Sequence, residues 1–167
     1  MQFILSVRKI RSGFDINAAA WRWFDATPAE RPAFLFLNYM DAHPPYLAPE
    51  PYTEWVRGLP ATPRLARRDL YAHEPRALTA TERAYIDANY DGQLRAADAA
   101  FGALIDDLKR RGRYDDALII MTSDHGTLLG EHGHLGHVGR MLYEPLLHIP
   151  LIVKFPGSTH LRGRVDT

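Results

Sequence analysis

Three short apolar runs constrain the fold of this chain more than any other feature. They are "AFLFLNYM" at residues 33–40, "ALIIM" at residues 117–121 and "PLIVKF" at residues 150–155. Each run is too short for a typical helix and has no polar face, which is the pattern of a strand that is buried on both sides. Pro32 precedes the first run, and Pro156 with Gly157 closes the third. The sequence therefore predicts three buried strands.

The segments between these runs predict helices. Asp15 is expected to cap a helix through "INAAAWRWF", and Thr79 begins a capping-box pattern with Glu82 at the start of a longer helix that Gly112 ends. Apolar residues of the longer helix recur at spacings of three and four: Tyr90, Leu94, Ala97, Phe101, Leu104, Ile105 and Leu108. Strands separated by helices or long crossovers indicate an α/β fold with a mostly parallel, doubly wound sheet flanked by helices. Ligands bind beyond the carboxyl ends of such strands.

Length and charge exclude several classes of protein. A chain of 167 residues with 46% hydrophobic residues is enough for one domain with a core. Its 20 basic and 20 acidic residues balance, so no footprint for nucleic acid stands out. The absence of cysteine excludes disulfides and thiolate metal sites. The opening "MQFILSVRKI" has neither the length nor the charge order of a signal peptide or membrane helix, and compartment and oligomeric state stay open.

The stretch "TSDHGTLLGEHGHLGH", residues 122–137, holds four of the eight histidines. Asp124 and His125 follow the second apolar run, where a carboxylate and a neutral imidazole can share a divalent cation, and Gly126 allows a close backbone approach. The alternative is that Asp124 caps a turn and His125 packs beside it. Two ligands do not complete a site, because a hard cation takes about six oxygens and zinc about four donors.

Other polar residues of the chain are predicted to serve structure. His132 and His134 are expected to lie in a tight surface loop and to bind backbone groups, with Glu131 orienting one of them. Asp98 is expected to be a buried hydrogen-bonding residue of the long helix. His148 is assigned to structure as well.

The stretch at residues 122–137, continued by "LYEPLLHIPLIVKFPG", resembles the second metal-binding segment of the sulfatase family, within the alkaline-phosphatase superfamily. "FLFLNYMDAHPPY" resembles the family's strand leading to an active-site histidine, and "YDGQLRAADAAFGALIDDLKRRGRYDDALIIMTSDHG" its helix-strand unit before the metal ligands. The similarity runs over nearly the whole chain in the family's order. It implies an alkaline-phosphatase-like fold, with residues 1–167 as a single, partial catalytic domain from the family's central to C-terminal region.

The resemblance also implies roles for particular residues. Asp124 and His125 would bind the catalytic divalent metal, calcium foremost, with manganese, zinc or magnesium as alternatives. His43 would face the transferred group or its leaving oxygen. His137 stands after Gly136 where the family commonly has a lysine, and it would donate a proton or a hydrogen bond to the leaving group. Arg140 would bind the substrate anion, and packing roles for His43 and His137 stay open.

The family's nucleophile motif, Cys/Ser-x-Pro-x-Arg, is missing from the chain, as are the family's first acidic metal ligands. The resemblance therefore implies a domain that is incomplete at both ends, with weak metal binding and no turnover by these residues alone. For the intact enzyme it implies hydrolysis of a small-molecule or saccharide sulfuric ester through a covalent intermediate. A phosphoryl or phosphonate ester hydrolase or transferase of the same superfamily, and a non-catalytic remnant, are the alternatives.

Overall fold

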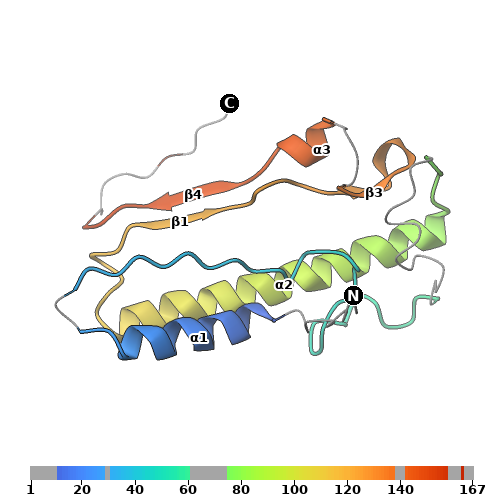
Figure 1. Cartoon of the computed structure of the whole chain (residues 1–167). Helices are drawn as coiled ribbons and strands as arrows, with labels where there is room; N and C mark the ends of the chain where they lie inside the picture. Colours follow the sequence, from blue (N-terminus) through green and yellow to red (C-terminus); the bar gives the residue numbers. More distant parts are fainter. Residues whose placement is uncertain (1–10, 29–30, 61–74, 138–141, 158–162, 164–167) are drawn as a thin grey trace, which may run out of the picture.

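The computed structural model describes residues 11–28, 31–60, 75–137, 142–157 and 163 (Figure 1). In chain order the elements are helix α1 (Gly13–Asp25), helix α2 (Ala80–Arg110), strand β1 (Ile119–Thr122), strand β2 (Leu128–Leu129), the 3-10 turn η3 (Glu131–Gly133), strand β3 (Leu135–Gly136), helix α3 (Glu144–Leu147) and strand β4 (Leu151–Lys154). None of the helices in these ranges is long and apolar enough to cross a membrane.

Both long helices begin with a capping box. In α2 the Thr79 hydroxyl accepts from the Glu82 backbone N–H, and the Glu82 carboxylate accepts from the Thr79 N–H at 2.8 Å, as the sequence predicts. In α1 the capping residue is Ser12, and Asp15 is its partner in the third position of the helix. The prediction that Asp15 itself caps α1 was wrong, because Asp15 donates its own backbone N–H to the Ser12 hydroxyl.

Helix α2 turns a partly polar face toward the rest of the molecule. Its buried residues are Ile86, Asn89, Gly92, Gln93, Ala96, Ala100 and Leu104. This face differs from the apolar stripe read from the sequence, since Leu94 is 42% exposed. Asp98 is exposed, so its prediction as a buried residue was wrong. The buried face includes polar residues because the side-chain amides of Asn89 and Gln93 point inward, where they bind backbone groups of residues 45–48.

Helix α1 packs against the carboxyl-terminal half of α2. The Asn17 side chain donates to the Ala100 carbonyl oxygen at 2.7 Å, and Gly13 lies so close to Ala100 that a Cβ at Gly13 would be 2.7 Å from the Ala100 Cβ. Figure 1 shows the two helices side by side along one edge of the molecule. The pair forms the base on which the following segment rests.

The two ladders within the described ranges are antiparallel. Strand β1 pairs with β4 in the register Ile119↔Lys154 to Thr122↔Leu151, and β2 pairs with β3. The predicted mostly parallel sheet is therefore not what these residues form. Parallel neighbouring strands are usually joined by a long helix that crosses over the sheet. The described residues between β1 and β4 contain a small hairpin and the four-residue α3 instead.

Residues 33–40 form no strand and lie as an extended trace between α2 and β1 (Figure 1). Phe34 and Phe36 are 85% and 82% exposed, and in the β1–β4 ladder Ile120 and Leu151 are 57% and 68% exposed. The prediction of three strands buried on both faces was therefore wrong: of the three apolar runs, only the second and third form strands, β1 and β4, and these are largely exposed. The reason is that the described residues provide no second layer over their outer faces.

The small core lies around the β2–β3 hairpin. It consists of Tyr46, Ile86 and Leu135, with Leu78, Tyr85, Tyr90 and Leu129 packed against them. Residues of α2, of the hairpin and of the chain before α2 meet here. The core therefore fixes the hairpin on the amino-terminal half of α2.

Candidate active site

Four residues predicted from the sequence lie together. The ring centroids of His43 and His137 are 5.3 Å apart, and those of His125 and His137 are 4.2 Å apart. The His125 Nε2 atom is 3.6 Å from the Asp124 Oδ2 atom. We call these four residues the histidine cluster. They come from three segments: the loop after residues 33–40, the loop after β1 and the chain directly after β3. Arg140 lies outside the described residues.

The loop that carries His43 is held by α1 on one side. The Asp41 carboxylate accepts from the Gly13 N–H at 2.9 and 3.2 Å, at the start of α1, where a negative charge is favourable. The Tyr39 hydroxyl donates to the Asn17 side chain. Burial raises the pKa of Tyr39 to about 12, with the Asn17 hydrogen bond opposing this and the Asp41 charge adding to it. Tyr39 therefore stays a neutral donor.

Helix α2 holds the same loop on its other side. The Gln93 side chain donates to the Pro45 carbonyl oxygen at 3.2 Å, and the Asn89 side-chain oxygen accepts from the Ala48 N–H at 2.9 Å. Both amides are buried, at 6% and 3% exposure. They explain why polar residues stand on the buried face of α2: a buried backbone group needs a partner, and these side chains supply it.

The loop that carries Asp124 and His125 rests on α3. The Gly126 N–H donates to the Leu146 carbonyl oxygen at 2.8 Å. A Cβ at Gly126 would overlap the Pro145 carbonyl group, so this position requires glycine for reasons of space. The Asp124 side chain is 86% exposed, and its Oδ1 atom accepts from the His125 N–H at 3.0 Å. Its Oδ2 atom faces His125.

The tautomers of two imidazoles follow from their backbone contacts. The Nδ1 atom of His43 is 2.7 Å from the Pro44 carbonyl oxygen, and that of His125 is 2.7 Å from the Gly126 carbonyl oxygen. A carbonyl oxygen only accepts, so each Nδ1 carries the hydrogen, and in the neutral ring each Nε2 has the lone pair. His125 thus offers Nε2 beside the Asp124 carboxylate.

His137 sits between the other two rings, and this position alters its acidity. Burial lowers the pKa of His137 below 6.5, and the neighbouring His125 and then His43 lower it further, while Asp124 opposes them. At neutral pH the His137 ring is therefore uncharged and has one N–H to donate. An anionic group bound nearby would favour its protonated form.

Asp124 and His125 have the right chemistry for two ligands of a divalent cation. A carboxylate oxygen and an imidazole Nε2 lie on the same side of their loop, which fits manganese or zinc and, through the carboxylate, calcium or magnesium. Within the part of the chain that the structure describes, no group of three or more histidine, aspartate or glutamate side chains is placed to hold a metal ion. A cation bound by this pair would need further ligands from outside the described residues.

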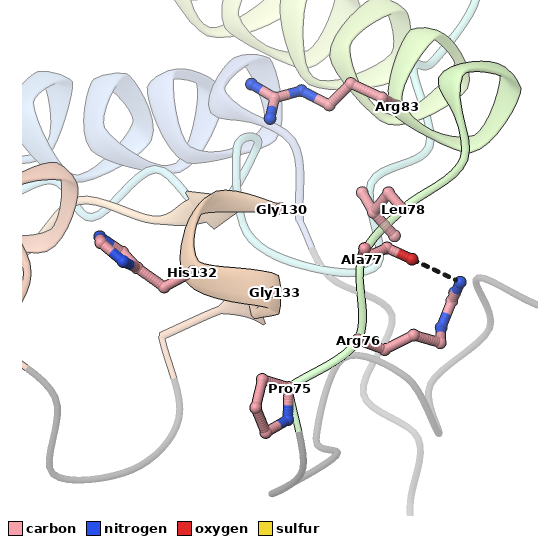
Figure 2. A pocket seen from close by; sticks show the side chains of 8 residues that line it. All are labelled: Pro75, Arg76, Ala77, Leu78, Arg83, Gly130, His132 and Gly133. Carbon is pink, nitrogen blue, oxygen red and sulfur yellow. Dashed lines mark hydrogen bonds between the residues drawn. The ribbon is translucent and has the colours of Figure 1, made fainter.

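A pocket of about 420 Å³ lies at the turn of the hairpin, and none of the histidine cluster lines it. Figure 2 shows its lining: Pro75, Arg76, Ala77, Leu78, Arg83, Gly130, His132 and Gly133. Arg76 pairs with Glu82 at 3.0 Å, and Arg83 pairs with Asp87 at 2.9 Å and with Glu131 at 3.0 Å. Both guanidinium groups of the pocket are thus already matched by carboxylates.

The tight loop predicted at residues 130–134 is confirmed, but Glu131 does not orient a histidine. Its carboxylate accepts from the Leu129 N–H at 2.6 Å and from Arg83. His132 adopts φ +55° and stacks on Tyr143, with ring centroids 3.8 Å apart. His132 is therefore fixed by aromatic packing.

Residues that brace the site were missed by sequence reasoning. They are Asn17, Asp41, Tyr46, Asn89, Gln93 and Thr127. Tyr46 is 3% exposed, and its hydroxyl is hydrogen-bonded to the Thr127 hydroxyl. A signal existed for some of them: Asn89 and Gln93 are polar residues four apart in a helix whose other inward positions are apolar or small.

Comparisons with known proteins agree on one family. A model of the sulfatase family matches residues 15–164. The multifunctional alkaline phosphatase superfamily protein PehA of Trinickia caryophylli is 30% identical over 161 residues, which cover 81% of this chain and 31% of PehA. An N-acetylglucosamine-6-O-sulfatase of Bacteroides thetaiotaomicron is 37% identical over 68 residues, which cover 41% of this chain and 12% of that protein.

A solved structure extends the likeness to the fold. The phosphonate monoester hydrolase of Agrobacterium radiobacter is 29% identical, with a TM-score of 0.66 over 88% of this chain and 34% of that structure. The chain thus spans about a third of the length of PehA and of the phosphonate monoester hydrolase. The described helices and antiparallel ladders therefore correspond to part of the fold of that enzyme.

Proposed function

Because the chain belongs to the sulfatase family, we propose that its histidine cluster forms part of the active site of a metal-dependent hydrolase that cleaves sulfuric esters. The observation that carries this proposal is the convergence of His43, His137 and the Asp124–His125 pair from three separate segments. Residues 1–167 would be part of one catalytic domain of the alkaline-phosphatase type. The exposed ladder would then be part of a larger, mostly parallel sheet.

The Asp124 Oδ2 and His125 Nε2 atoms would hold the divalent cation, with calcium as the first candidate and manganese, zinc or magnesium as alternatives. When bound, such a cation supplies Lewis-acid stabilisation to a non-bridging oxygen of the ester. Their arrangement supports this role, since neither atom is used by a backbone hydrogen bond.

His43 and His137 would act on the leaving oxygen of the ester. A neutral His137 donates a hydrogen bond from its ring N–H as negative charge develops, and its proximity to that charge favours its protonation. Because the Nδ1 atom of His43 is held by the Pro44 carbonyl, its Nε2 atom is the ring nitrogen that would reach the leaving oxygen. Arg140 would bind the sulfate oxygens.

The substrate would be a small-molecule or saccharide sulfate ester. Similarity to an N-acetylglucosamine-6-O-sulfatase supports a saccharide sulfate ester as the substrate. The likeness to a phosphonate monoester hydrolase, with a TM-score of 0.66, supports a second candidate, hydrolysis of phosphonate monoesters by the same cluster.

The test is a kinetic comparison on the full natural polypeptide that contains this sequence. We expect hydrolysis of p-nitrophenyl sulfate that depends on added metal and exceeds hydrolysis of p-nitrophenyl phenylphosphonate. Removing a group that assists proton transfer costs about 10²- to 10⁴-fold in rate, so His137→Ala should lower kcat by that order. Asp124→Ala should abolish the metal-dependent hydrolysis.

His148→Ala is the matched control, because His148 is exposed and lies outside the cluster. It should retain the wild-type rate. A preference for the phosphonate ester would favour the second candidate. A wild-type rate in His137→Ala would contradict the role proposed for the cluster.

A further inference from the structure

The two halves of the histidine cluster are joined by a hydrogen bond between side chains that sequence reasoning did not single out. Tyr46 lies three residues after His43, and Thr127 lies two residues after His125. Their hydroxyls are hydrogen-bonded to each other across 81 residues of chain. The bond therefore connects the His43 loop directly to the loop that carries Asp124 and His125.

Packing directs the Tyr46 hydroxyl toward Thr127. The Tyr46 side chain is 3% exposed and packs in the core with Ile86 and Leu135. Its ring meets Tyr90 edge to face, with ring centroids 5.7 Å apart. A buried ring with neighbours on several sides has few alternative rotamers, so its hydroxyl occupies a fixed place.

The backbone around Tyr46 is held independently. Gln93 binds the carbonyl of the preceding Pro45, and Asn89 binds the N–H of Ala48 two residues later. These bonds anchor the His43 loop to α2, whereas the His125 loop is anchored to α3 through Gly126 and Leu146. Each loop thus has its own support, and the two supports lie on different elements.

We propose that the Tyr46 and Thr127 hydroxyls form a positioning pair that sets the placement of His43 relative to His125 and His137. This inference rests on the proposed function, in which these rings act on one ester. The pair touches no reacting atom. It acts through the separation of 5.3 Å between the His43 and His137 rings. Displacements of about 1 Å in an active site can cost about a hundredfold in rate, so such a brace has a large effect.

The test uses Tyr46→Phe and Thr127→Val, which remove one hydroxyl each and keep most of the side-chain volume. The readout is the set of histidine ring signals in the full natural polypeptide labelled with ¹³C at histidine Cε1, recorded without substrate. We expect both variants to shift the signals of the clustered histidines. Thr127→Ser, which keeps the hydroxyl, should restore the wild-type positions.

Tyr90→Phe is the matched control, because it removes a tyrosine hydroxyl from the same core, keeps the ring that packs on Tyr46, and leaves the hydrogen bond between Tyr46 and Thr127 in place. It should leave the cluster signals in place, whatever its effect on Tm. Unchanged signals in both Tyr46→Phe and Thr127→Val, or equal shifts in Tyr90→Phe, would overturn the positioning pair. If Tyr46→Phe does not fold, the Thr127→Val and Thr127→Ser comparison decides.

Kinetics separate this proposal from the proposed function. In an active polypeptide, Tyr46→Phe should lower kcat about ten- to a hundredfold, with KM within about twofold, because substrate binding is retained and alignment is lost. A wild-type polypeptide that hydrolyses neither ester would overturn the proposed function, and the histidine signals would still decide whether the pair positions the cluster.

Discussion

At the site, two imidazoles are oriented by the backbone of the residue that follows each of them. His43 and His125 both direct Nδ1 to the carbonyl of the next residue, Pro44 or Gly126. Every residue has a backbone carbonyl, so no pattern of side chains in the sequence predicts the orientation of these two imidazoles. The sequence predicted Asp124 and His125 from their position after an apolar run, and the family resemblance added His43 and His137. Their orientation and the hydroxyl contact of Tyr46 depend on tertiary packing that no local pattern encodes.

Gly126 gives a prediction that depends on space alone. In Gly126→Ala the new methyl group would overlap the Pro145 carbonyl, so the loop or α3 must move. Overpacking of this kind costs about 1–3 kcal/mol, and we expect a loss of that size in the free energy of unfolding from urea titration. Gly102→Ala is the control, because nothing lies within 4 Å of a Cβ added at Gly102. Replacing glycine by alanine inside a helix should raise the free energy of unfolding by about 0.5–1 kcal/mol. Equal effects of the two variants would contradict the close approach.

Among the elements, the helices were predictable and the strands were only partly so. Capping boxes are local, which is why the start of α2 at Thr79 could be read directly. The buried face of α2 could not be read, because Asn89 and Gln93 are buried by contacts with a loop far away in sequence. The predicted strand at residues 33–40 failed for a related reason: an apolar run becomes a strand only where another strand pairs with it.

The capping box of α2 has a pH dependence. The hydrogen bond from Arg76, followed by that from the Thr79 backbone, lowers the pKa of Glu82 to about 2 from 4.5. A lowered folded-state pKa contributes stability above pH 4.5, and this contribution is lost as the pH falls toward 2. We expect Glu82→Gln to be less stable than wild type at pH 7 by at most about 1 kcal/mol, since the ion pair is partly exposed.

The measurement is urea unfolding of both proteins at several pH values. The difference between Glu82→Gln and wild type should shrink between pH 4.5 and pH 2. Asp106→Asn serves as the comparison, because the Asp106 carboxylate is exposed and lies 3.9 Å from Lys109. A difference for Glu82→Gln that is constant over this range would show that its charge does not stabilise the helix.

For the whole molecule, the apolar surface is the dominant property. Phe34 and Phe36 are more than four-fifths exposed, and both strands of the β1–β4 ladder present apolar side chains to solvent. Exposed apolar surface favours association. We therefore expect the 167-residue chain, produced alone, to self-associate with rising concentration in sedimentation velocity, and the double variant Phe34→Ser/Phe36→Ser to shift it toward the monomer.

Leu94→Gln is the control for this experiment. Leu94 is 42% exposed on α2, and a single exposed leucine on a helix contributes little to association. A chain that sediments as a monomer at all concentrations would contradict the prediction. So would an equal effect of Leu94→Gln and of the double variant.

The hydrogen bond between Tyr46 and Thr127 also bears on the order in which the molecule folds. Its partners are 81 residues apart, whereas the capping box of α2 and the β2–β3 hairpin close within a few residues of chain. Closing a long loop costs more chain entropy than closing a short one, so distant contacts form after local ones. The helix and the hairpin therefore precede the site, and the histidines meet only when the two loops dock. The backbone amides of Ala48, which donates to Asn89, and of Gly126, which donates to Leu146, should become protected from hydrogen exchange last during refolding.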